Sequence, residues 1–274
     1  MKSLPVLALL AAAILSLASP AAAAVGAWGQ GSRADVRLVS AGVSEDGTLS
    51  GGIEIELPPG WKTYWRTPGD AGVPPVFDFA GSENLVGVPV VSYPVPTRED
   101  DGFAVTNVYL DRVLLPFTAK IADRSKPVEI ALRAQIGACS DICIPEDVTL
   151  NLAVPAGDED AEVADALAIV GKTVPGAPEP GTFAFAALAR DGGTDKRPVF
   201  RITGIVPDAK DATVFVEGPA DWGAYTPEFA GSGTDAAWTI KFSRLGAKTP
   251  IAGASFRITA MSGDKAVEQT LTLP

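Results

Sequence analysis

The sequence predicts an all-β protein made of two antiparallel β-sandwiches that are joined by a short helix and a linker rich in proline and glycine. Three observations lead to this prediction: short segments that alternate apolar and polar residues, turn signals between them, and a helix-like stretch followed by prolines and glycines near the middle of the chain. The apolar content of 47% is too high for a disordered chain. We expect a first sandwich over 25–156, a helix and linker over 157–181, and a second sandwich over 182–274.

The N-terminal residues have the features of a secretory signal peptide. Lys2 provides a positive charge, 4–17 are apolar, and the alanines at 22–24 offer a small-residue cleavage site before Val25. The apolar run is too short to span a bilayer, which takes about 20 residues. We therefore predict that 1–24 are a signal peptide and that the remaining chain is exported to the periplasm without a membrane anchor.

Alternation predicts the strands of the first sandwich. Residues 53–57 alternate apolar and acidic side chains, and the even positions of 128–136 are all apolar. The pattern returns in 150–154. Turn sequences at 45–47 and 58–60 contain glycine or proline and separate such segments.

The pattern changes after Pro155. Residues 158–170 begin with acids and continue with alanine, leucine and valine, which predicts one short helix with acids near its N-terminus. Residues 172–182 are rich in proline and glycine and predict a linker. Strand patterns then return at 200–203, 214–216, 238–242 and 256–259.

Composition excludes several classes of function. A net charge of −11 argues against binding nucleic acid or anionic membranes. The absence of histidine from the sequence removes Ser-His-Asp and Cys-His catalysis, histidine-ligated zinc and CxxCH haem attachment. Only two methionines are present, so a methionine-rich copper site is not available either. We expect no cofactor and no metal site.

Cys139 and Cys143 are the only cysteines. In an exported protein such a pair is a structural disulfide or a dithiol that cycles. A bridge that closes so short a loop stabilises the fold by about 2 kcal/mol, against about 4–5 kcal/mol for a loop near 100 residues. The short spacing therefore favours redox chemistry but leaves a non-redox binding module with a structural bridge open. A Cu(I)-handling protein is a third interpretation, although two thiolates lack a third ligand.

The sequence around the cysteines predicts their reactivity. Asp141, Glu146 and Asp147 are acidic, and no lysine or arginine lies nearby in the sequence. Because negative neighbours disfavour a thiolate, we expect a pair that is slow with small thiols and that reacts with a partner able to dock and activate it.

Several motifs together resemble the N-terminal periplasmic domain of the DsbD/ScsB family of thiol–disulfide interchange proteins, the ScsB branch above all. The resemblance extends from Val36 to Pro155 and continues more weakly in the second half, at 215–222. The motifs are GWKTYWRTPGDAGVP at 60–74, YPVP at 93–96, LLP at 114–116 and CSDICIPE at 139–146.

The resemblance implies an immunoglobulin-like fold with a redox-active dithiol, as a component of a protein-disulfide reductase. Such domains take electrons from a membrane-embedded partner through a thioredoxin-like domain and pass them to oxidised periplasmic proteins. Cys143 matches the cysteine that attacks partners, and Cys139 matches the resolving cysteine. Tyr64 matches an aromatic residue that lines the site, and Phe103 matches the lid of a mobile cap loop.

Both aromatic side chains have an alternative, which is an ordinary place in the sandwich core. Family members continue into a membrane domain and a thioredoxin-like domain that this sequence lacks. We therefore expect the electron donor to be a separate protein.

Overall fold

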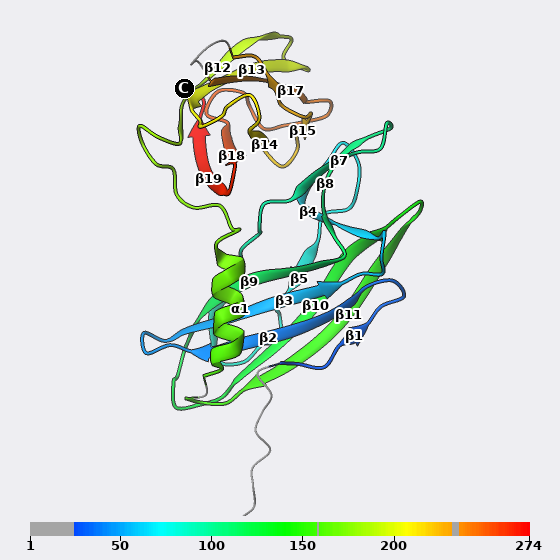
Figure 1. The fold of residues 1–274 in the computed structure, drawn as a ribbon, viewed down its shortest axis with the longest axis vertical. Helices are drawn as coiled ribbons and strands as arrows, with labels where there is room; N and C mark the ends of the chain where they lie inside the picture. Colours follow the sequence, from blue (N-terminus) through cyan, green and yellow to red (C-terminus); the bar gives the residue numbers. More distant parts are fainter. Residues whose placement is uncertain (1–24, 158, 232–235) are drawn as a thin grey trace, which may run out of the picture.

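The computed structural model describes residues 25–157, 159–231 and 236–274, which form nineteen strands and one helix (Figure 1). Every strand pair is antiparallel. The all-β prediction is confirmed. The predicted signal peptide lies outside the described residues.

The first sandwich consists of two sheets. One has the strand order β1-β2-β3-β9-β6, and the other has the order β11-β10-β4-β8-β7 with β5 added to β10. The strands are β1 (Gly29–Gln30), β2 (Asp35–Val43), β3 (Thr48–Glu56), β4 (Lys62–Gly69), β5 (Val76–Asp78), β6 (Leu85–Val91), β7 (Thr97–Asp100), β8 (Val105–Leu110), β9 (Arg112–Ile121), β10 (Val128–Cys139) and β11 (Cys143–Val154).

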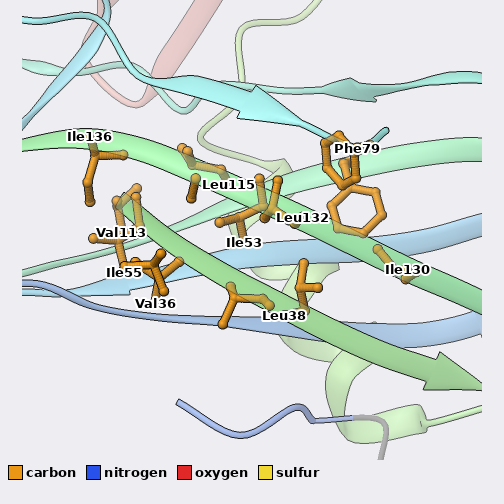
Figure 2. Close-up of a cluster of buried hydrophobic side chains, with 14 of the residues drawn as sticks. Val36, Leu38, Ile53, Ile55, Phe79, Val113, Leu115, Ile130, Leu132 and Ile136 are labelled. Atoms are coloured by element: carbon orange, nitrogen blue, oxygen red, sulfur yellow. The ribbon is translucent and has the colours of Figure 1, made fainter. Parts of the chain in front are cut away.

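Alternating burial along the strands builds the core between these sheets. In β10 the apolar even-numbered residues are buried, and the polar side chains of Glu129, Arg133 and Gln135 are exposed. The predicted strands at 53–57, 128–136 and 150–154 are confirmed. Figure 2 shows aliphatic side chains from both sheets in contact, with Phe79 at one end of the cluster.

The β10–β11 hairpin is the longest paired unit of this sandwich. Its register runs without a shift from Val128 opposite Val154 to Cys139 opposite Cys143. At the same end β4 joins β10 through a single register pair, Lys62 opposite Cys139. The fold thus brings both cysteines and the start of β4 to one corner of the molecule.

Helix α1 (Ala161–Gly171) covers the outer face of the sheet formed by β1, β2, β3, β9 and β6, and it contacts β2, β3 and β9 (Figure 1). Asp160 caps it by accepting a hydrogen bond from the Val163 amide at 2.9 Å. The helix therefore begins three residues later than predicted, because Asp160 acts as the cap. Gly52 of β3 makes room for it, since a Cβ there would crowd Leu167.

The second sandwich follows the linker. One sheet has the order β12-β13-β17-β15 with β16 on β17, and the other has the order β14-β18-β19. The four predicted strands are confirmed as parts of β13, β14, β17 and β18, whereas the predicted domain boundaries stay a prediction. The strands are β12 (Ala184–Gly193), β13 (Pro198–Ile205), β14 (Thr213–Glu217), β15 (Gly223–Ala224), β16 (Glu228–Phe229), β17 (Ala236–Ser243), β18 (Ser255–Ser262) and β19 (Lys265–Thr272).

The two sandwiches meet through β4 and β7 on one side and β14 and β19 on the other. Phe215 of β14 packs against Trp65, with ring centroids 5.2 Å apart. Arg66 pairs with Glu217 at 2.6 Å and also with Glu268. We call this contact the junction.

Candidate redox site

Cys139 and Cys143 form a disulfide at the tip of the β10–β11 hairpin, with their Cα atoms 4.1 Å apart. The two residues differ sharply in exposure. Cys139 is completely buried, whereas Cys143 is exposed. Ser140 closes the turn between them by donating its amide hydrogen to the Ile142 carbonyl at 3.0 Å. An external thiolate can therefore reach Cys143, and its partner sulfur is shielded.

The disulfide lies on the outer face of its sheet. Odd-numbered residues of β10 point away from the main core, and Cys139 is one of them. It is buried because Tyr64 and Val108 form a small separate apolar cluster with it. Most of the outer face is exposed, so this cover is local to the site.

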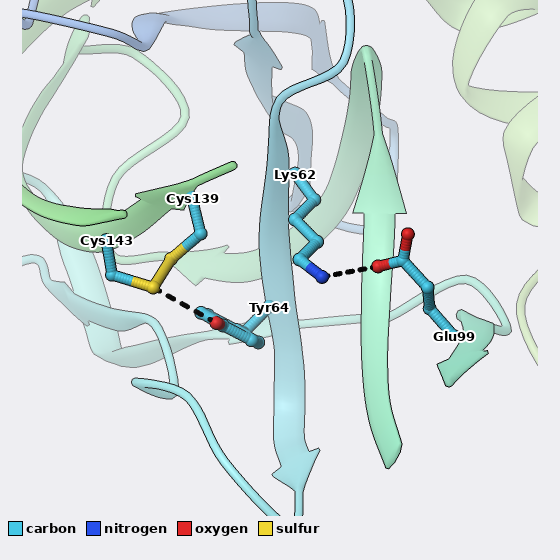
Figure 3. Close-up of a disulfide and its surroundings, with 5 residues drawn as sticks. All are labelled: Lys62, Tyr64, Glu99, Cys139 and Cys143. Carbon is cyan, nitrogen blue, oxygen red and sulfur yellow. Dashed lines mark hydrogen bonds and ion pairs between the residues drawn. A yellow bond between two sulfur atoms is a disulfide. The ribbon is translucent and has the colours of Figure 1, made fainter. Parts of the chain in front are cut away.

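Tyr64 of β4 contacts the exposed cysteine directly. Its hydroxyl lies 3.3 Å from the Cys143 Sγ, and it donates the hydrogen because a disulfide sulfur carries none (Figure 3). Burial raises the pKa of Tyr64, so the hydroxyl keeps its proton at neutral pH. The structure thus places this predicted site residue beside the disulfide.

Two glycines hold the tyrosine ring in place. A Cβ at Gly72 would overlap the ring, and a Cβ at Gly137 would lie 3.4 Å from it. Gly72 also has a φ of +117°, which side chains disfavour. The GDAGVP stretch of the sequence motif therefore provides one wall of the tyrosine pocket.

Lys62 was missed by the sequence analysis. Its register pair with Cys139 puts both side chains on one face, which Tyr64 shares two residues further along β4. The Lys62 side chain is 13% exposed, and its ammonium pairs with Glu99 at 2.5 Å (Figure 3). Lys62 is far from both cysteines in the sequence and is brought to them by strand pairing. The alternation Lys62-Thr63-Tyr64 could have found it once Tyr64 was assigned to the site.

Two of the three acids expected beside the cysteines make contacts elsewhere. Glu146 lies three residues beyond Cys143, about 10 Å along the strand, and accepts hydrogen bonds from the Ser32 and Arg33 amides at 2.8 and 2.7 Å. Asp147 pairs with Arg133 at 2.5 Å, which lowers the pKa of the aspartate. Asp141 remains in the turn between the cysteines, so the negative surroundings predicted from sequence are reduced to one exposed residue of the three.

Phe103 lies at the tip of the β7–β8 hairpin. Asp101 organises this tip by accepting hydrogen bonds from the Phe103 and Ala104 amides, each at 2.9 Å. The Phe103 side chain is 99% exposed. In this conformation it does not cover the disulfide, and its role as a lid stays a prediction.

Two further properties concern the described residues, 25–157, 159–231 and 236–274. Within them no group of three or more cysteine, aspartate or glutamate side chains is arranged to hold a metal ion. No helix among them has the length and apolar content needed to cross a bilayer.

The first sandwich matches a known family. Residues 34–155 match the family described as "Thiol:disulfide interchange protein DsbD, N-terminal". This part of the chain is similar to the N-terminal domain of that family. The match ends at Pro155, just after β11, so it includes the disulfide hairpin and both sheets of the first sandwich.

One solved structure is similar to almost the whole chain. It is the crystal structure of the N-terminal periplasmic domain of ScsB from Proteus mirabilis, with a TM-score of 0.71 and 21% identity, and the match covers 92% of this chain and 98% of the other. The likeness confirms the expected immunoglobulin-like all-β fold and includes the second sandwich. The comparison with curated proteins gives no match.

Proposed function

We propose that this chain is a periplasmic thiol–disulfide interchange protein that passes reducing equivalents to partner proteins through Cys139 and Cys143. One observation carries the proposal: a disulfide with one exposed and one buried cysteine, at the turn end of a hairpin in a domain similar to the DsbD N-terminal family. Exposure of one sulfur is what an exchange protein requires, because attack must come from a second protein.

The difference in exposure between the two cysteines supports different roles for them. In the reduced protein the Cys143 thiolate attacks a disulfide of the substrate protein, and one substrate sulfur leaves as a thiolate. The Cys139 thiolate then attacks the Cys143 Sγ of this mixed disulfide and displaces the second substrate thiolate. Two electrons pass to the substrate, and the Cys139–Cys143 bridge forms.

A separate donor restores the dithiol by the reverse route. The donor thiolate, from a thioredoxin-like or membrane-embedded partner, attacks Cys143, and Cys139 leaves as a thiolate. A second donor thiol then resolves the mixed disulfide. Attack at Cys143 is favoured because Cys139 is fully buried.

The position of the bridge argues against a purely structural role. β10 and β11 are paired by their backbones along the whole length of the hairpin, from Val128 to Cys139. A bridge across so short a loop contributes about 2 kcal/mol. The two strands are adjacent without it, so the covalent link adds little that hydrogen bonding does not provide.

Single-cysteine variants test the proposal. The probe is a thioredoxin that keeps only its attacking cysteine and carries a thionitrobenzoate leaving group, whose release is followed by absorbance. Cys139→Ala, which retains the exposed Cys143, should form the mixed disulfide at least about tenfold faster than Cys143→Ala. Equal rates would show that the two sulfurs are not distinguished, and the proposed mechanism would be wrong.

A further inference from the structure

The burial of Cys139 creates a chemical problem for the proposed exchange. This sulfur must carry a negative charge twice: when it leaves during reduction of the bridge, and when it attacks to resolve a mixed disulfide. It is completely buried between Tyr64 and Val108. Burial in apolar surroundings raises the pKa of a thiol and slows both steps, because a good leaving thiol has a low pKa.

Lys62 is placed to solve this problem. It lies directly opposite Cys139 in the antiparallel register, and residues so paired have Cβ atoms about 4.5–5.5 Å apart. Its side chain is on the same sheet face as the sulfur and is 13% exposed, so solvent screens its charge only weakly. Figure 3 shows Lys62 and Tyr64 near the start of β4, with the disulfide beside Tyr64 and the Lys62 ammonium directed toward Glu99.

We propose that Lys62 is a positioning residue that stabilises the thiolate of the buried Cys139, while Glu99 holds its ammonium in place. The inference rests on the proposed function and deepens it. Two residues of β4 then have different roles. Tyr64 contacts the Cys143 sulfur, which partners attack. Lys62 stabilises the Cys139 thiolate, which leaves during reduction and attacks during resolution.

Three acidic side chains near the site oppose the positive charge of Lys62. Glu99 reaches in from β7, Asp101 lies in the β7–β8 turn, and Asp141 is exposed in the turn between the cysteines. Lys62 lowers the pKa of Tyr64, whereas Asp101 and Glu99 raise it, so these charges act on one neighbourhood. The acids are more exposed than Lys62, and their fields are more strongly screened.

The electron flow shows where the lysine acts. When the donor thiolate attacks the Cys143 Sγ, the S–S bond breaks and its electron pair goes to the Cys139 Sγ beside Lys62. When the protein reduces a substrate, the Cys139 thiolate attacks the Cys143 Sγ and displaces the substrate sulfur from it. A positive charge next to Cys139 stabilises the charge that develops in both steps.

The test measures the pKa of Cys139 in the full chain with Cys143→Ala, from the Cβ chemical shift as a function of pH. Adding Lys62→Met should raise this pKa by about one unit or more, and Lys62→Arg should keep it low. Lys120→Met is the matched control. It removes the same charge from a lysine of β9 in the other sheet and should leave the pKa unchanged.

Glu99→Gln separates electrostatics from simple loss of structure. It breaks the same ion pair as Lys62→Met but leaves the ammonium unpaired, so the pKa of Cys139 should fall instead of rise. Shifts of both variants in the same direction, or no shift in a folded Lys62→Met protein, would overturn the inference. A shifted pKa in a protein that exchanges with no partner would refute the proposed function alone.

Discussion

The two sandwiches share an architecture, but of the two the first carries the candidate redox site. The second is built around an aromatic cluster and, within its described residues, has no cysteine. The first places a disulfide, a tyrosine and a lysine on the outer face of a sheet, outside its main core. The candidate redox site thus lies on the outer face of the first sandwich, separate from its apolar core. The aromatic cluster of the second sandwich consists of Phe200, Trp222, Phe242 and Phe256.

The second sandwich nevertheless reaches toward the redox site. Arg98 of β7 donates a hydrogen bond to the Val214 carbonyl at 2.6 Å and lies over the Phe215 ring. Glu99, the partner of Lys62, is the next residue of β7, and the strand leads to the Phe103 turn. Despite this connection, the contrast between the two sandwiches predicts separable effects. Substitutions at the tip of the β10–β11 hairpin should change thiol–disulfide exchange, and substitutions in the aromatic cluster should change stability.

Replacing both cysteines, Cys139→Ala with Cys143→Ala, should have the largest effect on function and a small one on folding. Thiol–disulfide exchange should be lost completely. The free energy of unfolding should fall by only about 2 kcal/mol, because the bridge closes a short loop. Urea denaturation alongside an exchange assay tests this. A loss of 5 kcal/mol or more would mean that the bridge is structural.

Phe200→Ala should have the opposite profile. This side chain is completely buried and contacts three other aromatic rings of the second sandwich. Its removal should cost about 3–5 kcal/mol of stability. The reduction potential of the folded protein should stay the same. A shift in potential would show that the second core and the disulfide are coupled.

Arg66→Met tests the junction. The Arg66 side chain is 15% exposed, and its guanidinium pairs with Glu217 and Glu268. Its removal takes this cation from the partly buried Glu217 and leaves Glu268 with the more distant Arg257, at 3.7 Å. The free energy of unfolding should fall by about 3 kcal/mol. Limited proteolysis of 172–182 should accelerate if the sandwiches separate. Arg201→Met is a half-buried control on the second sandwich, and its proteolysis rate should match that of the parent protein.

Tyr64→Phe should have a smaller effect confined to the site. It removes the hydrogen bond to the Cys143 sulfur but keeps the ring between Gly72 and Gly137. One such bond is worth about 1 kcal/mol, or roughly a fivefold change in the equilibrium between disulfide and dithiol. Equilibration with glutathione measures it. A change above a hundredfold would mean that the hydroxyl does more than donate one bond.

Acid should weaken both sandwiches slightly and by the same mechanism. Hydrogen bonds from the Thr249 and Lys248 amides lower the pKa of Asp221, and Arg133 lowers the pKa of Asp147. Their folded pKa values lie below the unfolded value of about 3.9. The stability that these carboxylates contribute is therefore complete above that pH and is lost as the pH falls through the folded values. Asp221→Asn and Asp147→Asn should each flatten the acid side of a thermal-stability profile.

The sequence was sufficient where one face of a strand is buried. β10 and β11 alternate so regularly that the strands and their buried faces were predictable. Helix α1 was also predicted, but its start was placed three residues too early because Asp160 is the cap. β6 was not predicted, because at the edge of its sheet it exposes Val86, Val88 and Val90. Its sequence contains no polar side chain, so it shows no alternation of apolar and polar residues that would indicate a strand.

The composition of the site was only half predictable. The cysteines and Tyr64 came from motifs, and the role of Phe103 stays a prediction. Lys62 depends on the register between β4 and β10, which pairs it with Cys139, more than 70 positions away in the chain. Phe215 is another case, since it lies in a strand of the second sandwich but joins the core of the first. Pairings over such distances follow from the whole fold and not from any local pattern.

The reduction potential of the Cys139–Cys143 pair tests the central claim most directly. The full chain would be equilibrated in dithiothreitol and glutathione buffers of known potential, and free thiols trapped and counted at each point. A cycled dithiol predicts a value between about −120 and −270 mV, the range of exchange proteins. A value below about −300 mV, typical of structural disulfides, would contradict the account.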